Sequence, residues 1–85
     1  LNFEKEELSV KERYNDYILT SLRTMWGSDL IYIKETFGDA LFNYCITESE
    51  TYISTNRIEK KDNKLFLTDE GKLLADKIAS DLFFV

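Results

Sequence analysis

Apolar residues recur every three or four positions over the first two thirds of this 85-residue chain. This period is typical of amphipathic helices, and it predicts three of them before residue 57. The residues expected on their buried faces are Val10, Tyr14, Tyr17, Ile18, Leu22 and Met25 in the first, Leu30, Ile33 and Phe37 in the second, and Phe42, Cys45, Ile46, Ser49, Tyr52 and Ile53 in the third.

Capping signals set the expected boundaries of these helices. Ser9–Glu12 reads as a capping box, in which the Ser hydroxyl and the Glu carboxylate satisfy free backbone amides at the start of the first helix. Ser28 or Asp29 would cap the second helix, and Asp39 the third. The residues expected to end the three helices are Gly27, Gly38 and Asn56, the last in the left-handed conformation.

From Ile58 onward, the spacing of apolar residues changes from the helical period to a period of two. Ile58 is followed by charged residues and by Asp62-Asn63, after which Leu65 and Leu67 alternate with other residues. This pattern predicts a two-stranded hairpin with a tight turn. Thr68–Gly71 is expected to open a last helix, with Thr as its cap and Gly allowing close packing on the hairpin. The apolar stripe of that helix is Leu74, Ala75, Ile78 and Leu82.

The expected order of helix, helix, helix, hairpin and helix is that of a winged helix. We therefore predict a mainly α (α+β), winged-helix-like domain with a two-stranded β-hairpin wing and a C-terminal helix. Residues 1–8 are acidic and are expected to form an irregular linker from a missing N-terminal part, and residues 9–85 a single domain. The chain starts at Leu1 rather than Met, which fits a piece of a longer protein.

The residue types argue against catalysis by this chain alone. It contains no His, which excludes the common catalytic triads and most zinc sites, and no Gly-rich phosphate loop. Its single Cys45 cannot form an internal disulfide and is expected to be a small buried hydrophobe. We predict no catalytic, cofactor-binding or metal-binding residue here. A cytoplasmic location without a membrane span is expected from the lone thiol and the 32% charged residues.

A winged helix invites the hypothesis of a DNA-binding regulator, but the charges disfavour it. The chain carries a net charge of −5, and its third predicted helix, residues 39–56, contains three acidic residues and no Lys or Arg. Such a helix is repelled by phosphate. The basic residues of the wing, Arg57, Lys60, Lys61 and Lys64, are better explained as solubilising an exposed hairpin edge. Nucleic acid is not an expected partner, although the regulator stays an alternative.

The segment Arg23–Gly27 has two interpretations. In one, Arg23 and Trp26 face a partner or an anionic ligand, because the guanidinium fork suits carboxylates. In the other, Arg23 binds carbonyl groups at the helix end and Trp26 completes the core. The second is favoured by the pattern, and the first stays open.

Taken together, these residues resemble the C-terminal domain of oxygen-independent coproporphyrinogen III oxidase-like proteins, which belong to the radical S-adenosylmethionine group. The resemblance is carried by Glu7–Ile18, by the Leu-Arg-x-x-x-Gly phrase at Leu22–Gly27, by Phe37-Gly38, and by the Leu-Thr-x-x-Gly phrase within Leu67–Phe83. Trp26 and Asn56 depart from the residues expected in that family.

The resemblance implies a parent protein whose N-terminal barrel holds a [4Fe–4S] cluster and S-adenosylmethionine. That parent would convert coproporphyrinogen III to protoporphyrinogen IX by oxidative decarboxylation in haem biosynthesis. The present domain would be a non-catalytic accessory that contacts the barrel of the same chain, and porphyrinogen or haem only through the parent. The C-terminal domain of a related haem chaperone is the alternative that the resemblance leaves open.

Overall fold

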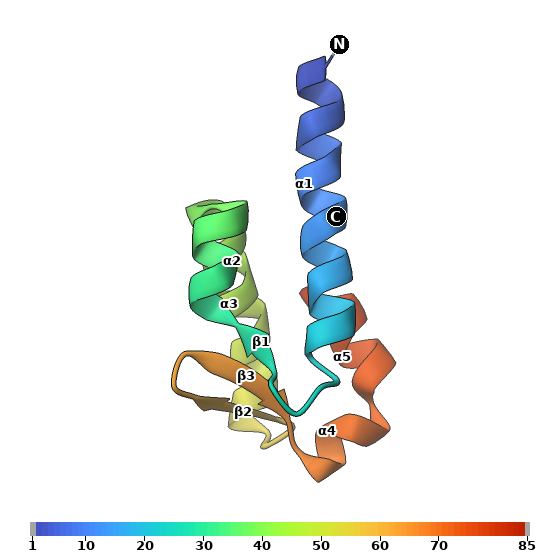
Figure 1. The fold of residues 1–85 in the computed structure, drawn as a ribbon. Helices are drawn as coiled ribbons and strands as arrows, with labels where there is room; N and C mark the ends of the chain where they lie inside the picture. Colours follow the sequence, from blue (N-terminus) through green and yellow to red (C-terminus); the bar gives the residue numbers. More distant parts are fainter. Residues whose placement is uncertain (1, 85) are drawn as a thin grey trace.

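The computed structural model describes the backbone of residues 2–84 and the side chains of residues 10–84. Helices and short strands follow each other in the order expected of a winged helix (Figure 1). The elements are α1 (Asn2–Ser21), β1 (Ser28–Asp29), α2 (Leu30–Phe37), α3 (Asp39–Ser54), β2 (Ile58–Lys61), β3 (Lys64–Leu67), α4 (Asp69–Leu73) and α5 (Ala75–Leu82). The predicted fold class, mainly helical with a β-hairpin wing and a C-terminal helix, is confirmed.

Helix α1 begins and ends earlier than the sequence pattern predicts. Residues 2–8 are helical rather than irregular, so Ser9 lies inside the helix and the capping box does not start it. The acidic residues there are good helix formers even without an apolar stripe. The helix ends at Ser21, and two backbone turns follow before Gly27, which has a φ of 72°. That residues 1–8 link to a preceding domain stays a prediction, and Leu1 lies outside the described residues.

The boundaries of α2 and α3 are close to those predicted. The Asp29 carboxylate accepts hydrogen bonds from the amides of Ile31 at 2.9 Å and Tyr32 at 3.1 Å, which confirms it as the cap of α2. Asp39, however, is the first residue of α3 and makes no side-chain cap; Gly38, with a φ of 100°, precedes it. Asn56 adopts the left-handed conformation after α3 as expected, with a φ of 63°.

The hairpin turn falls where it was predicted. Asp62 and Asn63 have φ values of 52° and 61°, the two successive positive angles that a type I′ turn requires. Strands β2 and β3 pair antiparallel, with Ile58 opposite Leu67. The sequence missed β1, which pairs with β3 on its other side and completes a three-stranded sheet in the order β1-β3-β2. Two residues are too few to show a strand period.

The predicted last helix is divided in two. The Thr68 hydroxyl caps α4 by accepting a hydrogen bond from the Gly71 amide at 3.1 Å. A Cβ at Gly71 would lie 2.0 Å from the Arg57 carbonyl oxygen, so α4 packs against the chain before β2 as closely as expected. The helical run breaks at Leu74 and resumes as α5. This break leaves Leu74 exposed, whereas Ile78 and Leu82 are fully buried.

The core lies between the helices and the inner face of the sheet. It contains most of the predicted stripe residues together with Leu41 and Ala79, which were not expected. The end of the chain is tied to the helices: the Tyr14 hydroxyl donates to the Leu82 carbonyl at 2.9 Å, and the Tyr44 hydroxyl donates to the Phe83 carbonyl at 3.0 Å. Helix α5 is thereby held beside α1 (Figure 1), which places it next to the residues that follow α1.

Candidate functional site

The loop between α1 and β1, residues 22–27, has buried ends and an exposed tip. Leu22 is buried in the core, and Gly27 lies so close to β3 that a Cβ there would be 2.5 Å from the Leu65 carbonyl oxygen. Between them, Met25 is 79% exposed and Trp26 is 69% exposed. The interpretation that Trp26 completes the core is therefore wrong. Met25 was expected on the buried stripe of the first helix, and because α1 ends at Ser21 that helical period does not reach it.

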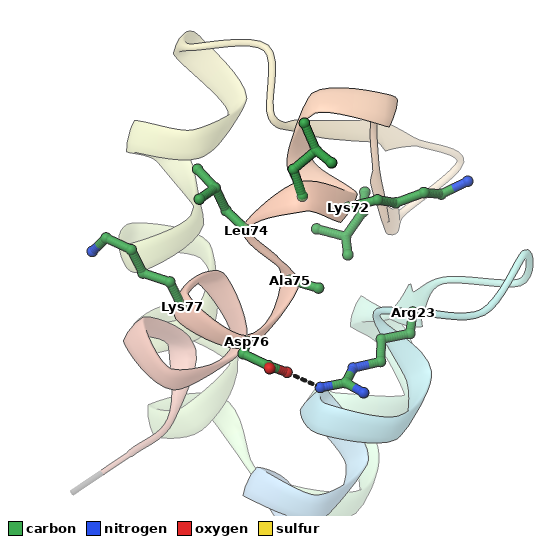
Figure 2. A pocket seen from close by; sticks show the side chains of 8 residues that line it. Arg23, Lys72, Leu74, Ala75, Asp76 and Lys77 are labelled. Atoms are coloured by element: carbon green, nitrogen blue, oxygen red, sulfur yellow. Dashed lines mark hydrogen bonds and ion pairs between the residues drawn. The ribbon is translucent and has the colours of Figure 1, made fainter.

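Arg23 makes a tertiary ion pair instead of binding the carbonyl groups at the end of its helix. Its guanidinium donates a hydrogen bond to the carboxylate of Asp76, in the first turn of α5 (Figure 2). The Arg23 side chain is 49% exposed and that of Asp76 is 88% exposed. Water competes for both groups at such exposure, and ion pairs of this kind stabilise proteins by about 0–1 kcal/mol. The guanidinium is held in place but can exchange its partner.

Two shallow grooves meet at Arg23, and Leu67 and Lys72 line both of them. The first, of about 520 Å³, runs along residues 72–77 and is drawn in Figure 2. The second, of about 580 Å³, lies between the 22–27 loop and the wing. Together their charged residues are the cations Arg23, Lys61, Lys72 and Lys77 and the carboxylates Glu59 and Asp76. This surface is thus net positive on a chain whose net charge is −5.

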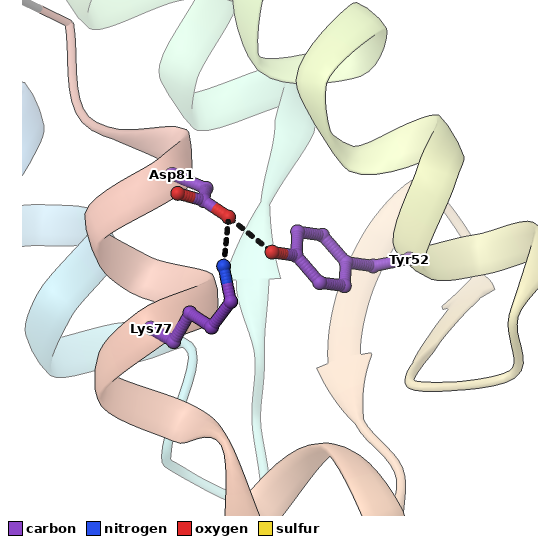
Figure 3. Close-up of polar contacts among 3 residues, drawn as sticks. All are labelled: Tyr52, Lys77 and Asp81. Carbon is purple, nitrogen blue, oxygen red and sulfur yellow. Dashed lines mark hydrogen bonds and ion pairs between the residues drawn. The ribbon is translucent and has the colours of Figure 1, made fainter.

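A second polar cluster holds α5 against α3. The Tyr52 hydroxyl donates to the Asp81 carboxylate, and Lys77 lies 3.4 Å from the same oxygen (Figure 3). The hydrogen bond from Tyr52, and then that from Lys77, hold the pKa of Asp81 below its ordinary value. The same hydrogen bond to Asp81 raises the pKa of Tyr52. This cluster links the exposed side of α5 to α3, while Ile78 and Leu82 hold the other side of α5 in the core.

The side chains at these grooves are suited to binding. Within residues 10–84, no three His, Cys, Asp or Glu side chains gather as a metal site would need. The Cys45 thiol is fully buried, and burial raises its pKa, so it is kept from acting as a nucleophile. The exposed cations can bind carboxylates, and the exposed Met25 and Trp26 offer apolar contact beside them.

The structure places the two predicted contact residues, Arg23 and Trp26, in one loop, but it gives them different surroundings. Arg23 lies between the grooves, whereas Trp26 stands at the loop tip. Lys61 and Lys72 were not among the predicted site residues, because they come from the wing and from α4. The fold brings the loop, the wing and α4 to one groove, and no spacing in the sequence signals this arrangement.

The charges on α3 bear on the hypothesis of a DNA-binding regulator. Helix α3 carries no Lys or Arg along Asp39–Ser54, so the face that a winged helix would turn toward DNA is acidic. That nucleic acid is not a partner stays a prediction. None of the helices described between residues 2 and 84 is long and apolar enough to cross a membrane.

Comparison with known proteins assigns the chain to a family. No curated protein and no solved structure is significantly similar to it. The family described as the HemN C-terminal domain, however, matches residues 8–74, a span that runs from α1 through the 22–27 loop and the wing to the end of α4. It covers most of the 85 residues. The chain therefore belongs to the HemN C-terminal domain family.

Proposed function

We propose that this chain is the accessory C-terminal domain of an oxygen-independent coproporphyrinogen III oxidase-like radical S-adenosylmethionine protein, and that it does no chemistry itself. The observation that carries the proposal is the match of residues 8–74 to the HemN C-terminal domain. In the parent protein, oxidative decarboxylation of coproporphyrinogen III to protoporphyrinogen IX would take place in an N-terminal barrel. A [4Fe–4S] cluster with S-adenosylmethionine would supply the radical chemistry there.

The residues of this chain do not fit that cluster. A [4Fe–4S] cluster needs several cysteine thiolates, and the chain has only Cys45, which is fully buried. Its contribution is structural: the domain packs beside the barrel, stabilises it and covers or shapes the porphyrin site. Arg23 and Trp26 are the residues proposed to make contact, because Arg23 lines both grooves and Trp26 is exposed in the same loop.

The test compares the intact parent protein with a parent that lacks residues 9–85. We expect the deletion to lower turnover of coproporphyrinogen and the thermal stability of the parent, while cleavage of S-adenosylmethionine by the isolated barrel persists. Arg23→Ala in the intact parent should lower turnover or porphyrin affinity, and Lys34→Ala, a cation on α2, is the matched control.

Two results would contradict the proposal. If the deletion leaves turnover, porphyrin affinity and stability unchanged, the domain is not an accessory of that reaction. If the parent does not decarboxylate coproporphyrinogen, but the domain gives a sharp Soret shift with stoichiometric haem, the haem-chaperone alternative replaces it.

A further inference from the structure

We infer that the surface formed by the 22–27 loop, the wing and α4 is a docking surface for an acidic, partly apolar segment of the parent protein. We call it the loop–α4 face and define it by Arg23, Met25, Trp26, Lys61, Lys72 and Leu73. In the free domain, Asp76 takes the position beside Arg23 that a carboxylate of the partner occupies on docking. The inference rests on the proposed function, since it names the surface through which the accessory domain acts.

The apolar part of this face is unusually exposed. The three most exposed large hydrophobic side chains among the described residues are Leu73 at 85%, Met25 at 79% and Trp26 at 69%. All three come from the loop and from α4, which meet at the shared groove residues. Trp, Met and Arg are enriched at protein interfaces, and exposed apolar groups gathered in one region mark interaction surfaces. The face therefore suits a protein partner better than a small ion.

The charges of the face select an acidic partner. Lys61 and Lys72 have no ion-pair partner among residues 10–84, and both line the groove beneath Met25. The only carboxylate lining that groove is Glu59. The chain as a whole carries a net charge of −5, so a second copy of it and an extended anionic surface such as a membrane are both repelled. A short acidic segment can contact the cations of this face without lying close to the acidic residues elsewhere on the domain.

The Arg23–Asp76 pair is the part of the face that can change partner. Both side chains are exposed, so the pair is weak and its carboxylate can be replaced by another. Asp76 also lies in the first turn of α5, where a carboxylate is favoured by the helix dipole even without Arg23. Separation of Asp76 from Arg23 therefore costs little free energy. The competition between Asp76 and the partner carboxylate for Arg23 then sets the docking affinity.

This arrangement predicts opposite effects for the two halves of one ion pair. Isothermal titration calorimetry would measure binding of the 85-residue chain to the N-terminal part of the parent, supplied in trans. Arg23→Ala should weaken binding about tenfold or more, whereas Asp76→Asn should tighten it about two- to fivefold because it frees the guanidinium. Lys61→Ala should weaken binding, and Lys60→Ala should not, because Lys60 lines a different groove beside α3.

A second measurement covers the case in which the N-terminal part does not fold alone. Thermal unfolding of the intact parent is compared with that of the 85-residue chain. In the chain, both substitutions break the same ion pair, and Asp76→Asn also removes a carboxylate from the first turn of α5, so both should lower the unfolding midpoint slightly. In the intact parent, Arg23→Ala should lower the midpoint and Asp76→Asn should raise it.

The outcomes separate this inference from the proposed function. If the two parts bind but Arg23→Ala and Asp76→Asn shift affinity and stability alike, the docking face is wrong and the accessory role stands. If the parts do not bind and deletion of residues 9–85 has no effect on the parent, the proposed function itself fails. Dimerisation of the chain abolished by Trp26→Ser, or binding to anionic phospholipid vesicles, would overturn the choice of an acidic protein segment.

Discussion

The hydroxyl groups of Tyr14 and Tyr44 offer a matched pair for measuring how the end of the chain is held. Each donates a hydrogen bond to a neighbouring backbone carbonyl, Tyr14 to Leu82 at 2.9 Å and Tyr44 to Phe83 at 3.0 Å. The difference is burial, since Tyr14 is 0% exposed and Tyr44 is half-buried. Substitution by Phe deletes the same group in both cases and leaves the ring.

The two substitutions should therefore lower the free energy of unfolding by different amounts. At Tyr14, the Leu82 carbonyl loses its donor in the core, where water cannot replace it, and a buried group left without its partner costs about 1–3 kcal/mol. At Tyr44, the hydrogen bond is only partly buried, so the loss of free energy of unfolding should be below about 1 kcal/mol. For a chain of this size, each kcal/mol corresponds to a shift in Tm of about 4–8 °C.

Urea unfolding at pH 7, followed by far-ultraviolet circular dichroism, measures both costs. The only tryptophan of the chain, Trp26, is already exposed and is a poor reporter of unfolding. The slope of the transition should be unchanged, so that midpoints compare stabilities directly. The reasoning is refuted if Tyr44→Phe costs as much as Tyr14→Phe, or if Tyr14→Phe costs less than about 0.5 kcal/mol.

Three further predictions concern the junction after the wing and the buried ionisable groups. Gly71→Ala should destabilise the chain by about 2 kcal/mol or more, because the new Cβ would overlap the Arg57 carbonyl oxygen; an unchanged Tm would contradict this. Thr68→Ala should cost about 1 kcal/mol by urea unfolding through loss of the α4 cap, and Thr68→Ser should restore most of it. Burial raises the pKa of both Tyr14 and Cys45 above their ordinary values of 10.0 and 9.0, so the unfolded chain ionises first. Stability should be full below pH 9 and decline above it, and Cys45→Ala should make that decline shallower between pH 9 and 10.

Features that depend on a few neighbouring residues could be predicted from the sequence. The turn at Asp62-Asn63 and the left-handed Asn56 follow from the tolerance of Asn and Asp for positive φ. The close packing at Gly71 follows from its missing Cβ. These are local steric preferences, and the surrounding fold does not overrule them.

Features that depend on distant contacts could not be predicted. The strand β1 exists because Ser28 and Asp29 meet β3, and a two-residue segment has no pattern of its own. Met25 was misplaced because the helix before it stops at Ser21, and a stripe extended past the end of a helix points in the wrong direction. Within the candidate site, Arg23 was found as an unusual residue, but its partner Asp76 lies 53 positions away.

The hydrogen bonds between α1 and residues 82–84 have a consequence for synthesis on the ribosome. Tyr14 finds its acceptor 68 residues later, and the Asn15 amide bonds the backbone of Phe84, 69 residues later, as both donor and acceptor. Contacts between such distant residues close nearly the entire chain into one loop. Helix α1 cannot complete these bonds until residue 84 has left the exit tunnel. The attachment of residues 82–84 to α1 therefore forms only after the other helices and the wing have been synthesised.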